Sequence, residues 1–276
     1  MPEEIYGWHL PPNLSVHGPQ IDLLIHTVQW FMLLLFVGWG IYFVYTLLRF
    51  RARPGHKASY ESTKNKLPKY VEVGVVLFEV FLLVGLSFPV WSMLKNDFPP
   101  EDEAFRVRVV AQQFAWNIQY PGRDGVFGKT FAQFVSIDNP VGIDPDDPNG
   151  KDDIVTINQF NFPVNTPVIA FISSLDVIHS FSIPVLRVKQ DAIPGSEIPI
   201  WWEATGTGAF EIQCAQLCGV GHSRMRGFVT IQTEEEYIAW MKDQEELQLD
   251  LPAEEPEAAP QVEEPVSPQE APGAEG

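Results

Sequence analysis

Residues 21–48 read IDLLIHTVQWFMLLLFVGWGIYFVYTLL and carry a single formal charge, Asp22, near their start. A helix needs about 20 apolar residues to cross the hydrocarbon core of a bilayer. A second apolar run, YVEVGVVLFEVFLLVGLSFPVWSML, follows at 70–94 and holds only two acids. Helices of this length in a soluble protein would show a polar face, and neither run does. The sequence therefore predicts a transmembrane helical hairpin over 21–95.

The connection between the two runs indicates their orientation. Residues 49–69 hold seven Lys or Arg against one acid. Positively charged loops stay in the cytoplasm, so this loop is predicted to be cytoplasmic and both ends of the chain to lie outside. The start of the chain, MPEEIYGWHL, lacks the basic region and the cleavage site of a signal peptide. We therefore expect 1–20 to be an extracytoplasmic segment and the first span to be an anchor.

The net charge of −18 is unevenly distributed. Residues 96–244 hold 10 basic and 20 acidic side chains, and the chain from 245 onward adds ten acids and no base. The stretch 250–276 is rich in Pro, Ala and Glu and has no aromatic residue, so it is predicted to be a disordered acidic tail. An acidic outer domain repels nucleic acid and favours a basic protein partner, although solubility alone would also explain the charge.

Between 100 and 232 the sequence has short β-rich runs separated by Pro, Gly and Asn/Asp clusters, and 138–153 is a polar loop. This pattern predicts an all-β domain over 96–249, an antiparallel sandwich or barrel. Thr233 followed by Glu236 forms a capping box, which predicts a closing helix over 233–249. The predicted strand runs are 105–120, 167–175, 179–184, 198–204, 208–214 and 227–232.

One stretch of this domain gathers potential metal ligands. Residues 214–225 read CAQLCGVGHSRM and hold both cysteines of the chain, one of its six histidines and one of its five methionines. A disulfide would suit an oxidising compartment but leaves His222 and Met225 unexplained. Zinc is a second interpretation, although Met is a poor zinc ligand. Thiolate, imidazole and thioether together favour copper used in electron transfer.

A dinuclear copper site would need a further imidazole from the same compartment. Four of the remaining histidines lie in the N-terminal segment, in the first span or in the cytoplasmic loop. Only His179, in the run SSLDVIHSFSIP, belongs to the predicted β domain. We therefore take His179 as a candidate ligand, although a lone histidine at a strand edge usually has a structural role.

The run SSLDVIHSFSIPVLRVKQDAIPG (173–195), followed by CAQLCGVGHSRM, resembles the CuA domain of subunit II of haem–copper cytochrome c oxidases. The resemblance covers about 20–232, including both spans and the segment AQQFAWNIQY. It implies a membrane-anchored cupredoxin-like β-barrel that holds two copper ions. The implied ligands are the bridging thiolates of Cys214 and Cys218, the imidazoles of His179 and His222, the weak thioether of Met225 and the backbone carbonyl of Gln216.

The sequence departs from the common family pattern in three places. Gln216 stands where the family has the Glu that helps to hold magnesium at the boundary with subunit I, which puts that magnesium site in doubt. Phe114 stands where the family often has the Trp through which electrons enter. Trp116 lies two residues further on, and residues two apart on one strand point to the same face. Because phenylalanine is a poorer electron mediator than tryptophan, we rank Trp116 slightly ahead of Phe114 for electron entry and keep Phe114 as the docking contact.

The third departure lies in the second span. Glu79 stands where the family commonly has Pro. Glu72, near the cytoplasmic end, aligns with the acid associated with a proton-channel entrance in the family, although an acid so near the interface could simply be solvated. An acid within a membrane span is a functional hypothesis in its own right.

The resemblance implies that the chain relays electrons from cytochrome c, or an equivalent carrier, to haem in subunit I. Oxygen would be reduced there to water with coupled proton translocation. It also implies further membrane subunits and an inner-membrane location with the copper domain on the periplasmic side. The chain itself shows no catalytic acid–base or nucleophile set and no Cys-x-x-Cys-His haem attachment. Two other classes stay open: a copper-free structural subunit of a quinol oxidase and a membrane-anchored copper-delivery protein.

Overall fold

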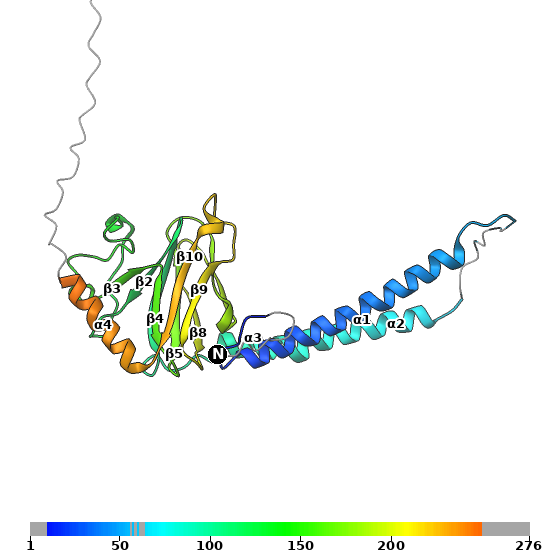
Figure 1. The fold of residues 1–276 in the computed structure, drawn as a ribbon, viewed down its shortest axis with the longest axis horizontal. Coiled ribbons are helices and arrows are strands. Elements are labelled where there is room, and N and C mark those ends of the chain that lie inside the picture. Colours follow the sequence, from blue (N-terminus) through cyan, green and yellow to red (C-terminus); the bar gives the residue numbers. More distant parts are fainter. Residues whose placement is uncertain (1–9, 56, 58–59, 61–63, 250–276) are drawn as a thin grey trace, which may run out of the picture.

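The computed structural model describes residues 10–55, 57, 60 and 64–249. A long helical hairpin extends from one side of a compact β domain, and a C-terminal helix covers the opposite side of that domain (Figure 1). The expected tail over 250–276 lies outside the described residues. Residues 1–9 of the N-terminal segment and part of the loop over 49–69 lie outside them too.

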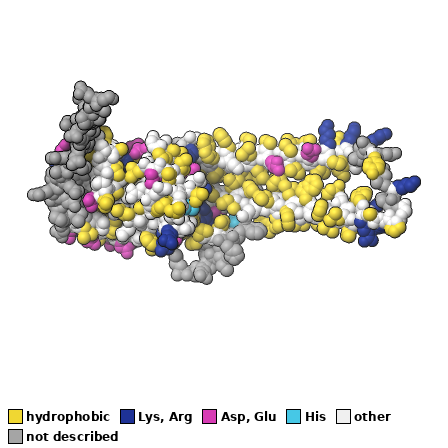
Figure 2. Space-filling model, turned by 90° about the horizontal axis from the view of Figure 1, so that it is seen from above, with side chains coloured by type: hydrophobic (Ala, Val, Ile, Leu, Met, Phe, Trp, Pro, Cys, Tyr) yellow, Lys and Arg dark blue, Asp and Glu magenta, His cyan; other side chains and the backbone are white. Residues whose placement is uncertain are grey.

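The hairpin is built from two long helices that match the two apolar runs. The first is α1 (Gly18–Phe50), and the second is a continuous helix over Leu67–Asn96. Each begins with a Pro in its first turn, where a missing N–H has no cost. Both are long and apolar enough to cross a membrane, and almost none of their apolar surface is buried within the chain. Figure 2 shows this apolar surface, with Lys and Arg gathered at the end away from the β domain.

The second helix changes its winding near its middle. It comprises α2 (Leu67–Val80), a π-helical segment η2 (Phe81–Ser87) and α3 (Phe88–Asn96). Pro89 has no N–H to donate to the carbonyl four residues earlier, which interrupts the α-helical ladder. At the end of the segment, the N–H of Phe88 bonds to the carbonyl of Leu83, five residues back.

The β domain consists of two five-stranded sheets, with the orders β3-β2-β1-β5-β8 and β4-β10-β9-β6-β7. In chain order the strands are β1 (Phe105–Gln112), β2 (Ala115–Tyr120), β3 (Ile154–Ile157), β4 (Gln159–Pro163), β5 (Pro167–Ser174), β6 (His179–Ile183), β7 (Val188–Ala192), β8 (Ile198–Glu203), β9 (Gly208–Cys214) and β10 (Arg226–Gln232). Four short 3-10 turns lie in the connections: η3 (Ala132–Phe134), η4 (Pro148–Gly150), η5 (Pro184–Leu186) and η6 (His222–Arg224).

The predicted all-β class is confirmed, but the sheets are mixed and not wholly antiparallel. β1 pairs with β5 in parallel, and β4 pairs with β10 in parallel, while the other pairs are antiparallel. The chain crosses from one sheet to the other between the members of each parallel pair. Apolar patterning within a run indicates a strand but not its direction, so the sequence could not predict these two pairings.

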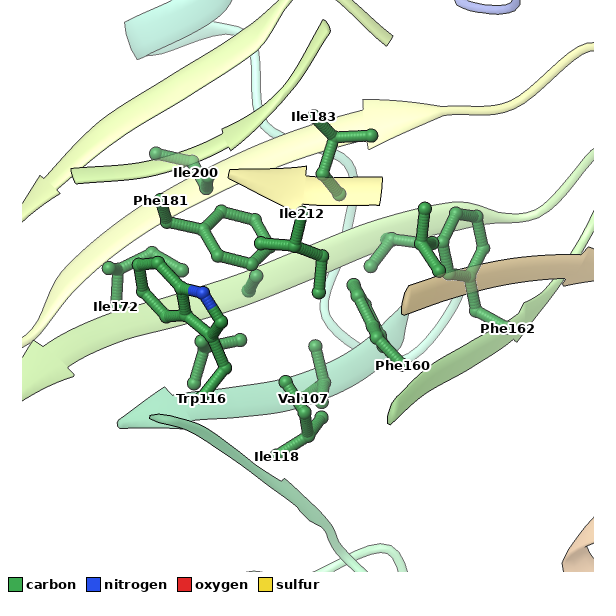
Figure 3. Packing of buried hydrophobic residues seen from close by; sticks show 14 of the residues in the cluster. Val107, Trp116, Ile118, Phe160, Phe162, Ile172, Phe181, Ile183, Ile200 and Ile212 are labelled. Atoms are coloured by element: carbon green, nitrogen blue, oxygen red, sulfur yellow. The ribbon is translucent and has the colours of Figure 1, made fainter. Parts of the chain in front are cut away.

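The two sheets enclose one apolar core. Its large buried side chains come from both sheets: Trp116, Ile118 and Ile172 from one, Phe160, Phe181 and Ile212 from the other. Their rings and branched chains interdigitate between the layers (Figure 3). The core therefore holds β6 and β9, the strands that bear the candidate ligands His179 and Cys214, against the opposite sheet.

The closing helix α4 (Glu234–Leu249) begins as predicted. The N–H of Glu236 donates to the hydroxyl of Thr233 at 3.3 Å, and the Glu236 carboxylate accepts from the N–H of Thr233 at 2.9 Å. This reciprocal capping box satisfies two N–H groups that the first turn leaves free. Trp240 of α4 packs edge-on against Tyr120 at 5.3 Å between ring centroids, which fixes the helix on the domain.

A buried ion pair joins the membrane hairpin to the β domain. The guanidinium of Arg187, between η5 and β7, donates to both carboxylate oxygens of Asp22 in α1, at 2.7 and 3.0 Å. It also donates to the carbonyls of Pro184 and Pro11, at 2.7 and 2.8 Å. The Arg187 side chain is 6% exposed and the Asp22 side chain 14%. The start of α1 is therefore held on the turn that follows β6.

We expect Asp22→Ala to loosen this junction without unfolding the β domain. The substitution leaves a buried guanidinium without its counter-ion, which costs about 3 kcal/mol. The N–H groups of Leu14 and Val16 bond to Val185 and Glu203 of the domain, so their hydrogen exchange reports the junction. Exchange at these groups should become roughly a hundredfold faster. Asp97→Ala, which removes an exposed acid just after α3, is the matched control. Equal exchange in both variants would show that the ion pair between Arg187 and Asp22 does not hold the junction.

Candidate metal centre

The two cysteines lie in the connection between two antiparallel strands. Cys214 is the last residue of β9, and the chain returns through the turn η6 to β10. Both cysteines are free, with their Sγ atoms 3.7 Å apart. A disulfide would need about 2.05 Å. Two sulfur ligands of one ion, each bound at about 2.3 Å, must lie closer than about twice that length, as these do.

Cys218 lies at the centre of the potential ligands. Its Sγ is 3.7 Å from each of three atoms: Sγ of Cys214, Nδ1 of His222 and Sδ of Met225. The side chains of Cys218 and Met225 are buried, whereas His222 is half-buried. Burial raises the pKa of the Cys218 thiol to about 11, with the neighbouring Cys214 adding to the effect. The metal-free thiol is therefore protonated at neutral pH, and a metal would displace its proton.

His179 reaches the same cluster from the neighbouring strand. It opens β6, which pairs with β9 so that Phe181 lies opposite Cys214. The imidazole is fully buried, and its Nδ1 lies 3.1 Å from Sδ of Met225. Sulfur and nitrogen ligand atoms of His179, Cys214 and Cys218 all lie within 4.8 Å of one another. The fold thus brings His179 next to a pair of cysteines, the first of which, Cys214, lies 35 residues further along the chain.

Asp176 orients His179, a contact that the sequence reasoning missed. Its Oδ1 lies 2.9 Å from Nε2 of the imidazole, on the side away from the sulfur atoms. Burial acts to raise the pKa of this carboxyl, but hydrogen bonds from His179, Gln113 and Val177 outweigh it and lower the pKa. A carboxylate on the outer nitrogen fixes the ring and leaves the inner nitrogen free to bind a metal. The signal was present in the run SSLDVIH, where an acid precedes the histidine by three residues.

Gln216 contributes its backbone to the site. The Sγ of Cys214 lies 3.1 Å from the carbonyl oxygen of Gln216. The side chain of Gln216 is exposed. The structure therefore brings the carbonyl, but not the side-chain amide, next to the sulfur atoms.

The two aromatic candidates occupy different environments. The chain turns at Gln113 and Phe114, so the predicted strand over 105–120 is two strands, and the rings of Phe114 and Trp116 do not share one strand face. Phe114 is half-buried, and its ring lies so close to Gly221 of the cysteine loop that a Cβ there would clash with it. Trp116 is fully buried, with its ring 6.2 Å from that of His179.

Gln113 ties this turn to the cysteine loop. Its side-chain amide donates to the carbonyl of Cys218 at 2.6 Å, and its N–H donates to Asp176 at 2.7 Å. The turn, the loop and the acid that orients His179 therefore form one hydrogen-bonded unit. No signal in the sequence singled out Gln113.

Comparison with known proteins gives a consistent result. Residues 105–232 match the family model described as cytochrome c oxidase subunit II, periplasmic domain. The chain is 32% identical over 238 residues to an alternative cytochrome c oxidase subunit 2 from Bradyrhizobium diazoefficiens, across 86% of this chain and 84% of that protein.

The chain belongs to the cytochrome c oxidase subunit II family.

Two further likenesses accompany this match. A cytochrome c oxidase subunit 2 from Cereibacter sphaeroides is 26% identical over 198 residues, across 66% of this chain and 65% of that protein. The crystal structure of the periplasmic domain of subunit II of cytochrome oxidase from Bradyrhizobium japonicum is 27% identical, with a TM-score of 0.40. The match covers 54% of this chain and 97% of the crystallised chain.

The donor set of this subunit II fits a soft, redox-active metal. Two thiols, a thioether and two imidazoles converge. The buried His179 presents Nδ1 toward the sulfur of Met225 while Asp176 lies against its other nitrogen. Thiolate and thioether ligands select copper over the hard cations that prefer oxygen. Copper is therefore the metal that the family and the side chains both favour.

The two acids of the second span are remote from this centre. Glu72 and Glu79 both lie in α2, in the part of the hairpin away from the β domain, and both are exposed (Figure 1). The structure does not bring either residue near the cysteine loop. Any role that they have concerns the membrane part of the oxidase.

Proposed function

We propose that this chain is the electron-entry subunit of a cytochrome c oxidase. In this proposal, two copper ions would be held by the thiolates of Cys214 and Cys218, with the imidazoles of His179 and His222, the thioether of Met225 and the carbonyl of Gln216 as the further ligands. The observation that carries the proposal is the convergence of these groups, with no disulfide between the cysteines. Sγ of Cys218 lies 3.7 Å from the ligand atoms of Cys214, His222 and Met225. The contacts between His179 and Met225 and between Cys214 and the carbonyl of Gln216 each span 3.1 Å.

The chemistry that bound copper supplies is one-electron oxidation and reduction. The protein's contribution is a fixed ligand frame: β6 and β9 are held by the core, and Asp176 fixes the imidazole of His179. Gln113 fixes the cysteine loop through the carbonyl of Cys218, and the ring of Phe114 covers that loop. A rigid frame needs little rearrangement when its charge changes, which favours rapid electron transfer.

The surroundings of the centre support a protein partner beside the ligands. Exposed apolar side chains, Ile178, Leu217 and Val220, lie beside the ligands. Apolar patches of this kind mark interaction surfaces. We propose that electrons arrive from cytochrome c or an equivalent carrier and pass to haem in subunit I, where oxygen is reduced to water with coupled proton translocation.

The membrane arrangement follows the same proposal. The basic loop over 49–69 supports a cytoplasmic position for that loop, and we propose that the copper domain lies on the periplasmic side of the inner membrane. Subunit I and further membrane subunits would cover the apolar surface of the hairpin. Gln216 offers an amide where the family has a carboxylate, so we propose that only its carbonyl serves the copper centre and that no magnesium ligand comes from its side chain.

Electron paramagnetic resonance of the copper-loaded full-length chain tests this proposal. Hyperfine splitting from two equivalent copper nuclei supports the dinuclear centre. Splitting from one nucleus would instead indicate a single-copper carrier. A chain that binds no copper would be a structural subunit, as in a quinol oxidase, and either result would overturn the proposal.

We expect Met225→Leu to keep copper but to change the reduction potential and the rate of electron transfer. The side chains have similar volumes, so the buried position should stay packed. A thioether is a weak ligand that tunes a copper centre more than it holds the metal. Copper content and potentiometric titration of the variant measure the two effects. Complete loss of copper would show that the thioether is an essential ligand.

A further inference from the structure

A series of hydrogen bonds links the start of the cysteine loop to the edge strand β7. Ser180 follows the candidate ligand His179 in β6, and its carbonyl accepts a hydrogen bond from the N–H of Ala215 at 2.9 Å. Ala215 stands between Cys214 and Gln216, two of the groups in the proposed ligand set. The position of Ser180 therefore bears on ligands of the strand and of the loop.

The bond between Ala215 and Ser180 extends the pairing of β9 with β6 into the loop. Phe181 lies opposite Cys214, which is the last residue of β9. The N–H of the next residue, Ala215, bonds to Ser180, the residue before Phe181. The first peptide of the cysteine loop is thus held on β6, one residue away from the imidazole of His179.

The side chain of Ser180 has a partner on the other neighbouring strand. Successive residues of a strand point to opposite faces, so Ser180 points away from the face of His179 and Phe181. Ser180 lies directly opposite Asp191 of β7, and its hydroxyl donates to Oδ1 of that residue at 2.7 Å. Ser180 is fully buried, and a buried hydroxyl without an acceptor is destabilising. The exposed Asp191 therefore holds a buried group beside a ligand.

The strand that carries Asp191 is itself fixed to the membrane hairpin. Arg187 directly precedes β7 and forms the buried ion pair with Asp22 of α1. The ammonium of Lys95, in the last turn of α3, donates to the side-chain carbonyl of Gln190 at 2.6 Å. Gln190 is the residue before Asp191. The carboxylate of Asp191 thus stands on a strand that both helices of the hairpin hold in place.

We propose that Asp191 is a positioning residue for the copper centre, and that it fixes His179 and the start of the cysteine loop relative to each other through Ser180. This inference rests on the proposed function, because it concerns the ligands proposed there. Asp191 acts through Ser180 and is not itself a member of the ligand set. A hydrogen bond to a charged acceptor is stronger than one to a neutral acceptor, so a carboxylate suits this position better than an amide.

Hydrogen exchange at the N–H of Ala215, in the metal-free full-length chain, tests the support of the loop. Asp191→Ala removes the acceptor, and this exchange should become roughly tenfold faster, because Ser180 is no longer held from β7. Asp191→Asn keeps an acceptor oxygen and should stay closer to the wild type. Lys189→Ala, which truncates an exposed side chain opposite Ser182 on the same strand, is the matched control and should exchange as the wild type does.

The copper-loaded chain tests the effect on the ligands. Asp191→Ala leaves every proposed ligand in place, so copper should stay bound while its resonance spectrum and its reduction potential change. Asp191→Asn loses the same negative charge, so its smaller change separates the hydrogen bond from the effect of charge. Ser180→Ala removes the other partner of the bond, and adding Asp191→Ala to it should cause little further change.

Three results would overturn the inference. The first is wild-type exchange at Ala215 in Asp191→Ala. The second is faster exchange with an unchanged copper spectrum and potential, because the bond would then support the fold without placing the ligands. The third is an equal copper change in Asp191→Asn and Asp191→Ala, which would assign the effect to charge. A wild-type chain that binds no copper would instead defeat the proposed function, and that result is distinct because it needs no variant.

Discussion

Cys218→Ser is expected to abolish the copper centre while the β domain stays folded. Cys218 Sγ lies 3.7 Å from the ligand atoms of Cys214, His222 and Met225, so every other side-chain ligand on the cysteine loop adjoins it. A serine hydroxyl is of similar size but does not supply the thiolate that copper selects. Cys214→Ser should have the same effect, because Cys218 alone cannot replace the second thiolate that the proposed dinuclear centre needs.

Copper content and the copper resonance of the full-length chain measure this effect, and circular dichroism reports the fold. Ser223→Ala, on the same loop but exposed and outside the ligand set, is the matched control and should bind copper as the wild type does. An unchanged copper spectrum in either cysteine variant would contradict the bridging assignment. A loss of β structure in both variants would show that the thiols stabilise the fold itself.

The ligands could be predicted from sequence because most of them are local. Cys214, Cys218, His222 and Met225 lie within one twelve-residue stretch, and a single β-hairpin connection brings them together. His179 could be predicted as a ligand only because it lies in the same predicted extracytoplasmic domain as the other ligands. The role of Asp176 depends on which ring nitrogen faces the sulfur atoms, and that orientation depends on the pairing of β6 with β9.

The sequence did not predict β3, β4 and β7, for two physical reasons. β3 and β4 are separated by the single residue Asn158, whose φ of 58° allows a sharp turn. No Gly or Pro stands beside it to indicate a turn in the sequence. β7 is an edge strand with the sequence VKQDA, in which few side chains are buried, so it lacks an apolar pattern. Long apolar runs, by contrast, allowed the hairpin to be located within a few residues of α1 and of the second helix.

The ranking of the two aromatic residues shows the same limit. From the sequence, Phe114 and Trp116 were interchangeable on one strand face, and the better electron mediator was placed first. The turn at Gln113 and Phe114 separates them, so Trp116 packs in the core and Phe114 remains at the surface. We therefore propose Phe114, which the sequence interpretation kept as the docking contact, as the contact for the donor, and a packing role for Trp116.

Trp116→Leu should consequently act on stability and Phe114→Leu on electron entry. Trp116 is fully buried against Phe181 at 5.4 Å, and truncating a buried aromatic ring of this size costs about 3–5 kcal/mol in the free energy of unfolding. Its indole N–H has no hydrogen-bond partner among the described residues. Trp116→Phe should therefore lose much less stability, because it keeps an aromatic ring and breaks no hydrogen bond.

Phe114→Leu removes a half-buried ring from above the cysteine loop and leaves every proposed ligand in place. We expect its copper spectrum and its unfolding temperature to stay close to those of the wild type, while donor oxidation measured by rapid mixing slows by several-fold. Trp116→Phe should pass electrons at the wild-type rate under the same conditions. If Trp116→Phe slows entry and Phe114→Leu does not, the electron path runs through the core residue, and the donor docks where that path reaches the surface.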